Sequence, residues 1–146
     1  MSYLLDTNVI SELTRAKPDK NVLAWFEDIP SEALYLSVLS LGEIRKGAEK
    51  ILDPHRREKI RLWLEHELPA WFENRILPID HAIADRWGRL QQVMQRPIPA
   101  IDSLLAATAL QHDLRLVTRN VADFQYPELL VIDPWGVGVK AFVQQR

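Results

Sequence analysis

The chain has 146 residues, of which 47% are hydrophobic and 26% are charged, and its formal net charge at pH 7 is −2. This composition is typical of one globular domain and excludes a disordered chain or a collagen-like repeat. The sequence contains no cysteine, which excludes disulfide scaffolds, cysteine nucleophiles and zinc sites built on cysteine.

The N-terminal segment does not look like a targeting sequence. It reads MSYLLDTN, with no basic stretch, and reaches an acid at Asp6. Nowhere does an apolar run approach the ~18 residues that a membrane-spanning helix needs. We therefore expect a soluble, cytoplasmic protein that forms a single domain over residues 1–146 and has no membrane partner.

Five short apolar runs predict buried strands, because each has the length of a strand and ends at a polar residue. In chain order they are residues 3–5, 34–36, 76–79, 114–117 and 129–132. The polar residues that follow them are Asp6, Ser37, Asp80, Thr118 and Asp133.

Amphipathic helices are predicted between these strands, from apolar residues that recur at helical spacing. A stripe over residues 38–52 predicts the first, and a second begins at Asp53-Pro54 and is expected to end at Pro69. A third runs from a cap at Asp80 to Met94, and a fourth covers residues 101–109. Alternation of helices with largely apolar strands indicates a parallel sheet that is covered on both faces.

Four acids lie near element ends that such a sheet would bring to one crevice. Ligands of open α/β sheets bind beyond the carboxyl ends of the strands, where the strand order reverses. Asp6 follows the first strand, and Glu43 lies in the second turn of the helix after the second strand. Asp102 opens the helix before the fourth strand, and Asp123 follows that strand.

Each acid also has a purely structural explanation. Asp6 is suited to cap a helix, and Glu43 is spaced to pair with Lys46 on its own helix. Asp102 is well placed against a helix dipole, and Asp123 is an ordinary turn residue.

The presence of four acids at one site requires a common explanation, because clustered ionised carboxylates repel one another unless a cation neutralises them. Oxygen ligands alone, with no cysteine and no suitably spaced histidine, favour Mg²⁺ or Mn²⁺. Such ions activate water and stabilise the leaving oxygen in phosphodiester cleavage.

Four segments resemble PIN-domain ribonucleases, and in particular VapC-type toxins of the FitB-like subgroup. They are YLLDTNVISEL at residues 3–13, LGEI at 41–44, IDSLLAATA at 101–109 and TRNVADF at 118–124. The resemblance covers essentially the whole chain in the family's order. Its first motif is quite specific, whereas the motif around Glu43 is much less so.

The resemblance implies a three-layer α/β/α sandwich with a five-stranded parallel sheet. It also implies a Mg²⁺- or Mn²⁺-dependent endoribonuclease toxin that arrests translation. A homodimer and a cognate antitoxin, encoded alongside and able to block the acidic site, are implied as partners. Asp6, Glu43, Asp102 and Asp123 match the family's acids, Thr7 matches the hydroxyl residue beside the first acid, and Thr118 and Asn120 match the polar positions before the fourth.

A second hypothesis remains open: the same fold could bind RNA or an antitoxin without cleaving. The segment from Arg45 to Arg61 carries an excess of positive charge, which a solvated helix face explains better than a track for the RNA backbone. Candidate RNA contacts are Arg15 and Arg119, which lie close to acids in the sequence, and Lys46 within the basic segment.

Overall fold

The computed structural model describes residues 1–136 and 141–143, in which two or three α-helices separate consecutive members of the first four strands. The strands are β1 (Tyr3–Leu5), β2 (Leu34–Ser37), β3 (Ile76–Leu77), β4 (Arg115–Val117), β5 (Leu130–Ile132) and β6 (Ala141–Val143). The α-helices are α1 (Thr7–Glu12), α2 (Lys20–Asp28), α3 (Val38–Glu49), α4 (Pro54–Leu62), α5 (Leu68–Phe72), α6 (His81–Met94) and α7 (Ala100–Gln111). Short helical turns cover Ser31–Ala33, Glu73–Arg75 and Val121–Phe124, and a π-helical segment covers Trp63–Glu67.

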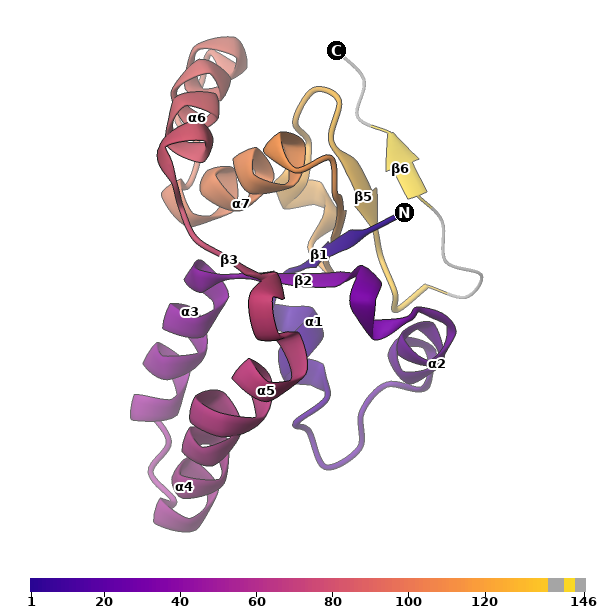
Figure 1. Ribbon diagram of the computed structural model, residues 1–146, viewed down its shortest axis with the longest axis vertical. Coiled ribbons are helices and arrows are strands. Elements are labelled where there is room, and N and C mark those ends of the chain that lie inside the picture. The colour runs from indigo at the N-terminus through magenta and orange to yellow at the C-terminus, as the bar shows by residue number, and fades with distance from the viewer. Residues whose placement is uncertain (137–140, 144–146) are drawn as a thin grey trace.

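The strands form one sheet in the order β3-β2-β1-β4-β5-β6 (Figure 1). Strands β1 to β5 are parallel, as predicted, and β6 adds an antiparallel edge strand beside β5 that the sequence patterns did not predict. The chain first builds outward from β1 through β2 to β3 and then continues on the other side of β1 with β4. The strand order therefore reverses between β1 and β4, where a ligand crevice is expected.

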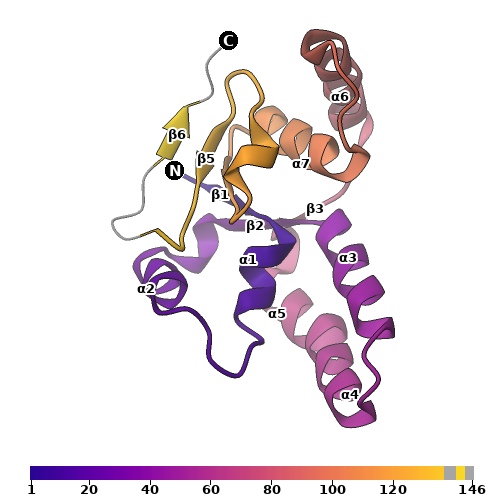
Figure 2. The same cartoon turned by 180° about the vertical axis from the view of Figure 1, so that it is seen from behind.

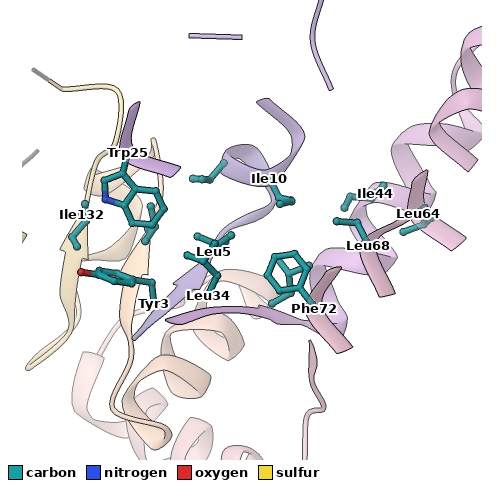
Figure 3. Close-up of a cluster of buried hydrophobic side chains, with 13 residues drawn as sticks. Tyr3, Leu5, Ile10, Trp25, Leu34, Ile44, Leu64, Leu68, Phe72 and Ile132 are labelled. Carbon is teal, nitrogen blue, oxygen red and sulfur yellow. The ribbon is translucent and has the colours of Figure 1, made fainter. Parts of the chain in front are cut away.

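Helices cover both faces of the sheet, which confirms the predicted three-layer sandwich. Figures 1 and 2 show α6 and α7 on one face and α1 to α5 on the other. Successive strand residues point to opposite faces. Leu4 therefore packs into the core beneath α6 and α7, while Tyr3 and Leu5 belong to the opposite core. Figure 3 shows that second core, in which Trp25 and Phe72 cover the sheet.

One helical prediction is wrong, and one helix was not predicted. Pro69 does not end the second helix: α5 continues through it to Phe72. Pro69 occupies the first turn of α5, where its missing N–H is not needed, directly after the wider π-helical segment. The sequence patterns also missed α2, a nine-residue helix with only two fully buried residues, whose first turn is capped by Asp19.

The predicted cap of α6 is confirmed, since Asp80 Oδ1 accepts a hydrogen bond of 2.9 Å from the backbone N–H of Ile83. Over residues 1–136 and 141–143, no helix has the length and apolar character needed to cross a membrane.

Candidate active site

The site is built at the carboxyl ends of β1 and β4, the two strands between which the sheet order reverses. Asp6 directly follows β1, and its backbone N–H donates to the carbonyl of Val117 at 2.9 Å. Thr118 directly follows β4, and its N–H donates to the carbonyl of Ile132 at 2.9 Å. The sheet ladder thus holds both residues at fixed positions at this edge.

Asp6 is the most enclosed acid of the site, with only 8% of the residue exposed. Its Oδ1 accepts a hydrogen bond of 2.7 Å from the N–H of Thr7 and so caps α1. Its Oδ2 accepts 2.8 Å and 3.3 Å bonds from the Thr118 hydroxyl and the Asn8 amide. The structural role expected of a helix cap is therefore real, but it engages one carboxylate oxygen only.

Glu43 is held by Thr7, not by a lysine of its own helix. The Thr7 hydroxyl donates to Glu43 Oε1 at 2.6 Å and lies 3.0 Å from the hydroxyl of Ser40, one turn earlier on α3. No ion pair between Glu43 and Lys46 forms in the described residues, so the surface-pair explanation is wrong. Ser40 is a buried contact of this group that the sequence analysis missed.

The fold brings the acids close enough for their charges to act on Asp6 and Asp102. Burial raises the pKa of Asp6 from 3.8 to about 6, with further contributions from the charges of Glu43 and Asp102, although hydrogen bonds from Thr118 and Thr7 oppose the shift. The pKa of Asp102 is also raised, first by partial burial and then by the charges of Asp123 and Glu43. These charges link Asp6 with Glu43 and Asp102, and Asp102 with Asp123, across distant parts of the chain.

Thr118 is the centre of a polar network below Asp6. Its hydroxyl donates to Asp6 and accepts a 3.0 Å bond from the backbone N–H of Asn120. Asn120 thus contributes through its main chain. Asn8 belongs to the first sequence motif, which does not predict a role for it. The side-chain Nδ2 of Asn8 donates to Asp6 and Thr118, and its side-chain Oδ1 accepts a 3.3 Å bond from the backbone N–H of Arg119. Its signal in the sequence is the two-residue spacing from Asp6.

Thr118→Val should lower the free energy of unfolding at pH 7 by about 1–3 kcal/mol, because it removes a donor from Asp6 and an acceptor from the Asn120 N–H. The hydrogen bond from Thr118 lowers the pKa of Asp6, so its loss should raise that pKa further. The destabilisation should therefore be larger at pH 8 than at pH 5. Urea denaturation at both pH values measures it. Thr118→Ser, which keeps the hydroxyl, is the control, and equal stability of the two variants would contradict the role of the hydroxyl.

Positive side chains do not neutralise the acids. None of the four acids takes part in an ion pair within the described residues. Arg15 instead contacts Glu12 at 3.3 Å, and the guanidinium of Arg119 lies 5.0 Å from the ring centroid of Trp135. Over residues 1–136 and 141–143, the site thus concentrates negative charge without a paired cation.

The donor chemistry of the site fits a hard divalent cation. Every candidate ligand is a carboxylate oxygen, and the four histidines, His55, His66, His81 and His112, are all exposed. A nearly buried carboxylate among other acids is stabilised when a cation joins it. As placed, however, no three acidic or histidine side chains in the described part of the chain form a ready metal-ligand cluster.

Comparisons with known proteins agree on one family. Residues 3–125, which include all four acids, match the family described as PIN domain. The chain is 35% identical to Toxin FitB of Neisseria gonorrhoeae over 135 residues, covering 90% of this chain and 97% of that protein. It is 36% identical to VapC ribonuclease Y4jK of Sinorhizobium fredii, covering 90% of this chain and 96% of that protein.

Solved structures share the same architecture. The crystal structure of FitAcB from Neisseria gonorrhoeae matches with a TM-score of 0.85 and 34% identity, covering 92% of this chain and 99% of that one. A toxin-antitoxin complex from Klebsiella pneumoniae matches with a TM-score of 0.69 and 28% identity, covering 93% of this chain and 100% of that one.

Proposed function

Since the chain belongs to the PIN-domain family, we propose that it is a metal-dependent endoribonuclease, the toxin of a toxin–antitoxin pair, which hydrolyses phosphodiester bonds in RNA and so arrests translation. One observation carries the proposal: beside the strand ends of β1 and β4, the charges of Glu43 and Asp102 act on Asp6 and those of Asp123 and Glu43 act on Asp102, and within the described residues no ion pair neutralises these acids. The similarity to a VapC ribonuclease and a FitB toxin supports the same chemistry.

Asp6, Glu43, Asp102 and Asp123 are the proposed ligands of Mg²⁺ or Mn²⁺. A divalent ion bound there supplies charge stabilisation for the phosphate and lowers the pKa of the attacking water. Thr7 orients Glu43, and Thr118 orients Asp6, through the hydrogen bonds described above.

The polar and basic residues around the acids complete the proposed site. Asn120 steadies Thr118 through its backbone N–H, and Arg15 and Arg119 are proposed contacts of the RNA phosphates. Arg119 is held for this role by its stacking on Trp135.

We further propose a cognate antitoxin and a second copy of the chain as protein partners. The similarity to a toxin-antitoxin complex supports the first of these. An antitoxin that covers the acids would keep RNA from them. We place the protein in the cytoplasm, where its proposed substrate is, and treat residues 1–146 as one nuclease domain.

Expression of the chain without an antitoxin should arrest growth, and Asp102→Asn should abolish the arrest. Asp102 is only partly buried and opens α7, so the neutral amide removes a ligand with little effect on folding. The purified variant should cleave structured RNA in the presence of Mg²⁺ or Mn²⁺ at least roughly 10²-fold more slowly than the unchanged chain. Asp85→Asn, which removes an exposed acid on α6, is the matched control and should keep both activities.

This experiment also separates cleavage from binding. If the chain acted only by sequestering RNA or an antitoxin, Asp102→Asn would still arrest growth. Undiminished arrest, together with the absence of RNA fragments, would therefore favour a binding module on the same fold.

A further inference from the structure

A groove beside Glu43 carries positive charge that the fold itself does not use. It lies between α3 and the start of α7, has a volume of about 490 Å³, and is lined by residues that include Val38, Gly42, Glu43, Lys46, Lys50 and Ile101. Figures 1 and 2 both show the start of α7 beside the first turn of α3. Because Ile101 precedes Asp102, the groove opens next to two of the four acids.

In the part of the chain that the structure describes, the two lysines of the groove form no ion pair, whereas Arg45 of α3 and Arg61 of α4 do. Arg45 contacts Glu65 of the neighbouring π-helical segment at 2.6 Å, and Arg61 also contacts Glu65. Within the described residues Lys46 and Lys50 form no ion pair. Their spacing of four residues places both ammonium groups on one face of the helix.

Two glycines of α3 add no side chains to the helix face that carries Lys46 and Lys50. Gly42 and Gly47 lie inside or near the end of a 12-residue helix, where glycine costs roughly 1 kcal/mol relative to alanine. A Cβ at either position would meet no atom within 4 Å. Packing of the protein therefore does not require glycine there, whereas close approach of a ligand to the helix would.

We propose that this groove binds the RNA strand next to the cleaved bond, with Lys46 and Lys50 contacting successive backbone phosphates. This inference rests on the proposed nuclease function and adds the path of the substrate. Four acids repel a polyanion, so a nuclease needs cations along the strand beyond the ion at the centre. Exposed Val38 and Ile101 offer apolar surface to the sugars and bases.

A structural explanation for the lysines makes a different prediction. Lys46 and Lys50 lie in the last turn and at the C-cap of α3, where a cation is stabilised by the helix dipole. If that were their whole role, replacing them would lower the melting temperature and leave RNA binding unchanged.

The test is binding of a fluorescein-labelled oligouridine in EDTA, where cleavage is off, followed by anisotropy at several salt concentrations. Lys46→Gln and Lys50→Gln should each weaken binding about threefold. The slope of log K against log salt should become shallower by about 0.7 per lysine, and by about 1.4 in the double variant. Lys20→Gln, which removes an exposed lysine on α2, is the matched control and should change neither quantity.

Gly47→Gln provides a second arm that does not depend on the lysines. Glutamine is a better helix former than glycine, so the melting temperature should not fall, yet its side chain should fill the groove and weaken binding. With cleavable RNA and Mg²⁺, the lysine variants should raise KM and leave kcat nearly unchanged.

Each outcome bears on the proposal. Unchanged binding and salt slope in the double lysine variant, with cleavage intact, would overturn the groove and leave the nuclease function standing. Absence of both binding and cleavage in the unchanged chain would overturn the nuclease function as well. A change of sedimentation in the lysine variants, with RNA affinity unaltered, would show that this face joins two copies of the chain and would also overturn the proposal.

Discussion

Asp6→Asn should slow RNA cleavage by roughly two to four orders of magnitude while the protein stays folded. Asp6 is the most buried of the four acids and feels the charges of Glu43 and Asp102. Removing its charge should weaken the binding of the proposed divalent ion at the site. The measurement is the rate of cleavage of a structured RNA at saturating Mg²⁺, with the protein freed of antitoxin.

Asparagine is the substitution that best separates chemistry from folding at this position. Asparagine is as good a helix cap as aspartate, so its oxygen can still accept from the N–H of Thr7. Asp85→Asn, at an exposed acid on α6, carries the same change of charge and should cleave normally. Equal rates for Asp6→Asn and the unchanged chain would reject the assignment of Asp6 as a ligand.

Without metal, Asp6 should make the protein less stable as the pH rises from about 4 to about 6, by about 3 kcal/mol. Burial raises the pKa of Asp6 from 3.8 to about 6, so the native state holds this proton more tightly than the unfolded chain does. Between these two values the native state binds more protons, and the free energy of unfolding therefore falls with pH. The cost is absent below the lower value and complete above the higher one.

Other acids of the chain change the stability with pH in the opposite direction. The quantity to measure is therefore the difference in unfolding free energy between Asp6→Asn and the unchanged chain. Hydrogen bonds from Arg61 and Arg45 lower the pKa of Glu58 and Glu65 respectively, and the stability from these pairs is lost as the pH falls. Subtracting the unfolding free energy of the unchanged chain from that of Asp6→Asn cancels these contributions. In EDTA, this difference should shift in favour of the variant by about 3 kcal/mol between pH 4 and pH 7.

Binding of a divalent ion should reverse the stability advantage of Asp6→Asn over the unchanged chain. At pH 7, Mg²⁺ at 100 times its dissociation constant should stabilise the unchanged chain by about 2.7 kcal/mol. Asp6→Asn should gain much less. A pH-independent stability difference, or equal stabilisation of both proteins by Mg²⁺, would mean that Asp6 acts only as the cap of α1.

The periodicity of apolar residues predicted most of the architecture. Runs such as Tyr3–Leu5 are buried on both faces, and only a strand in the middle of a covered sheet needs that pattern. The helix predictions failed at two places, the end of the second predicted helix and α2. A proline usually marks a helix end, but the π-helical segment before Pro69 lets the helix continue. Helix α2 has a readable signal that was overlooked, since Val22, Trp25 and Phe26 recur at helical spacing behind its N-terminal cap.

The sequence predicted which acids form the candidate site but not the hydrogen bonds that hold them in place. The positions of Asp6 and Thr118 follow from the rule that ligands bind where parallel strands end. The contact of Thr7 with Glu43 joins residues 36 positions apart, and that of Thr118 with Asp6 joins residues 112 positions apart. No local pattern encodes such pairings, because they arise only when the sheet brings separate strand ends together.

By itself, the sequence determined the layers, the parallel strands and the residue types at the strand ends, since burial and hydrogen bonding impose regular spacing along the chain. The tertiary structure alone decided how burial and neighbouring charges raise the pKa of Asp6, and which cations among the described residues pair with acids. These properties depend on distances and solvent exposure between segments far apart in the chain. The lysines beside Glu43, which form no ion pair with any residue that the structure describes, are of the second kind, because an ion pair exists only where folding places a partner within reach.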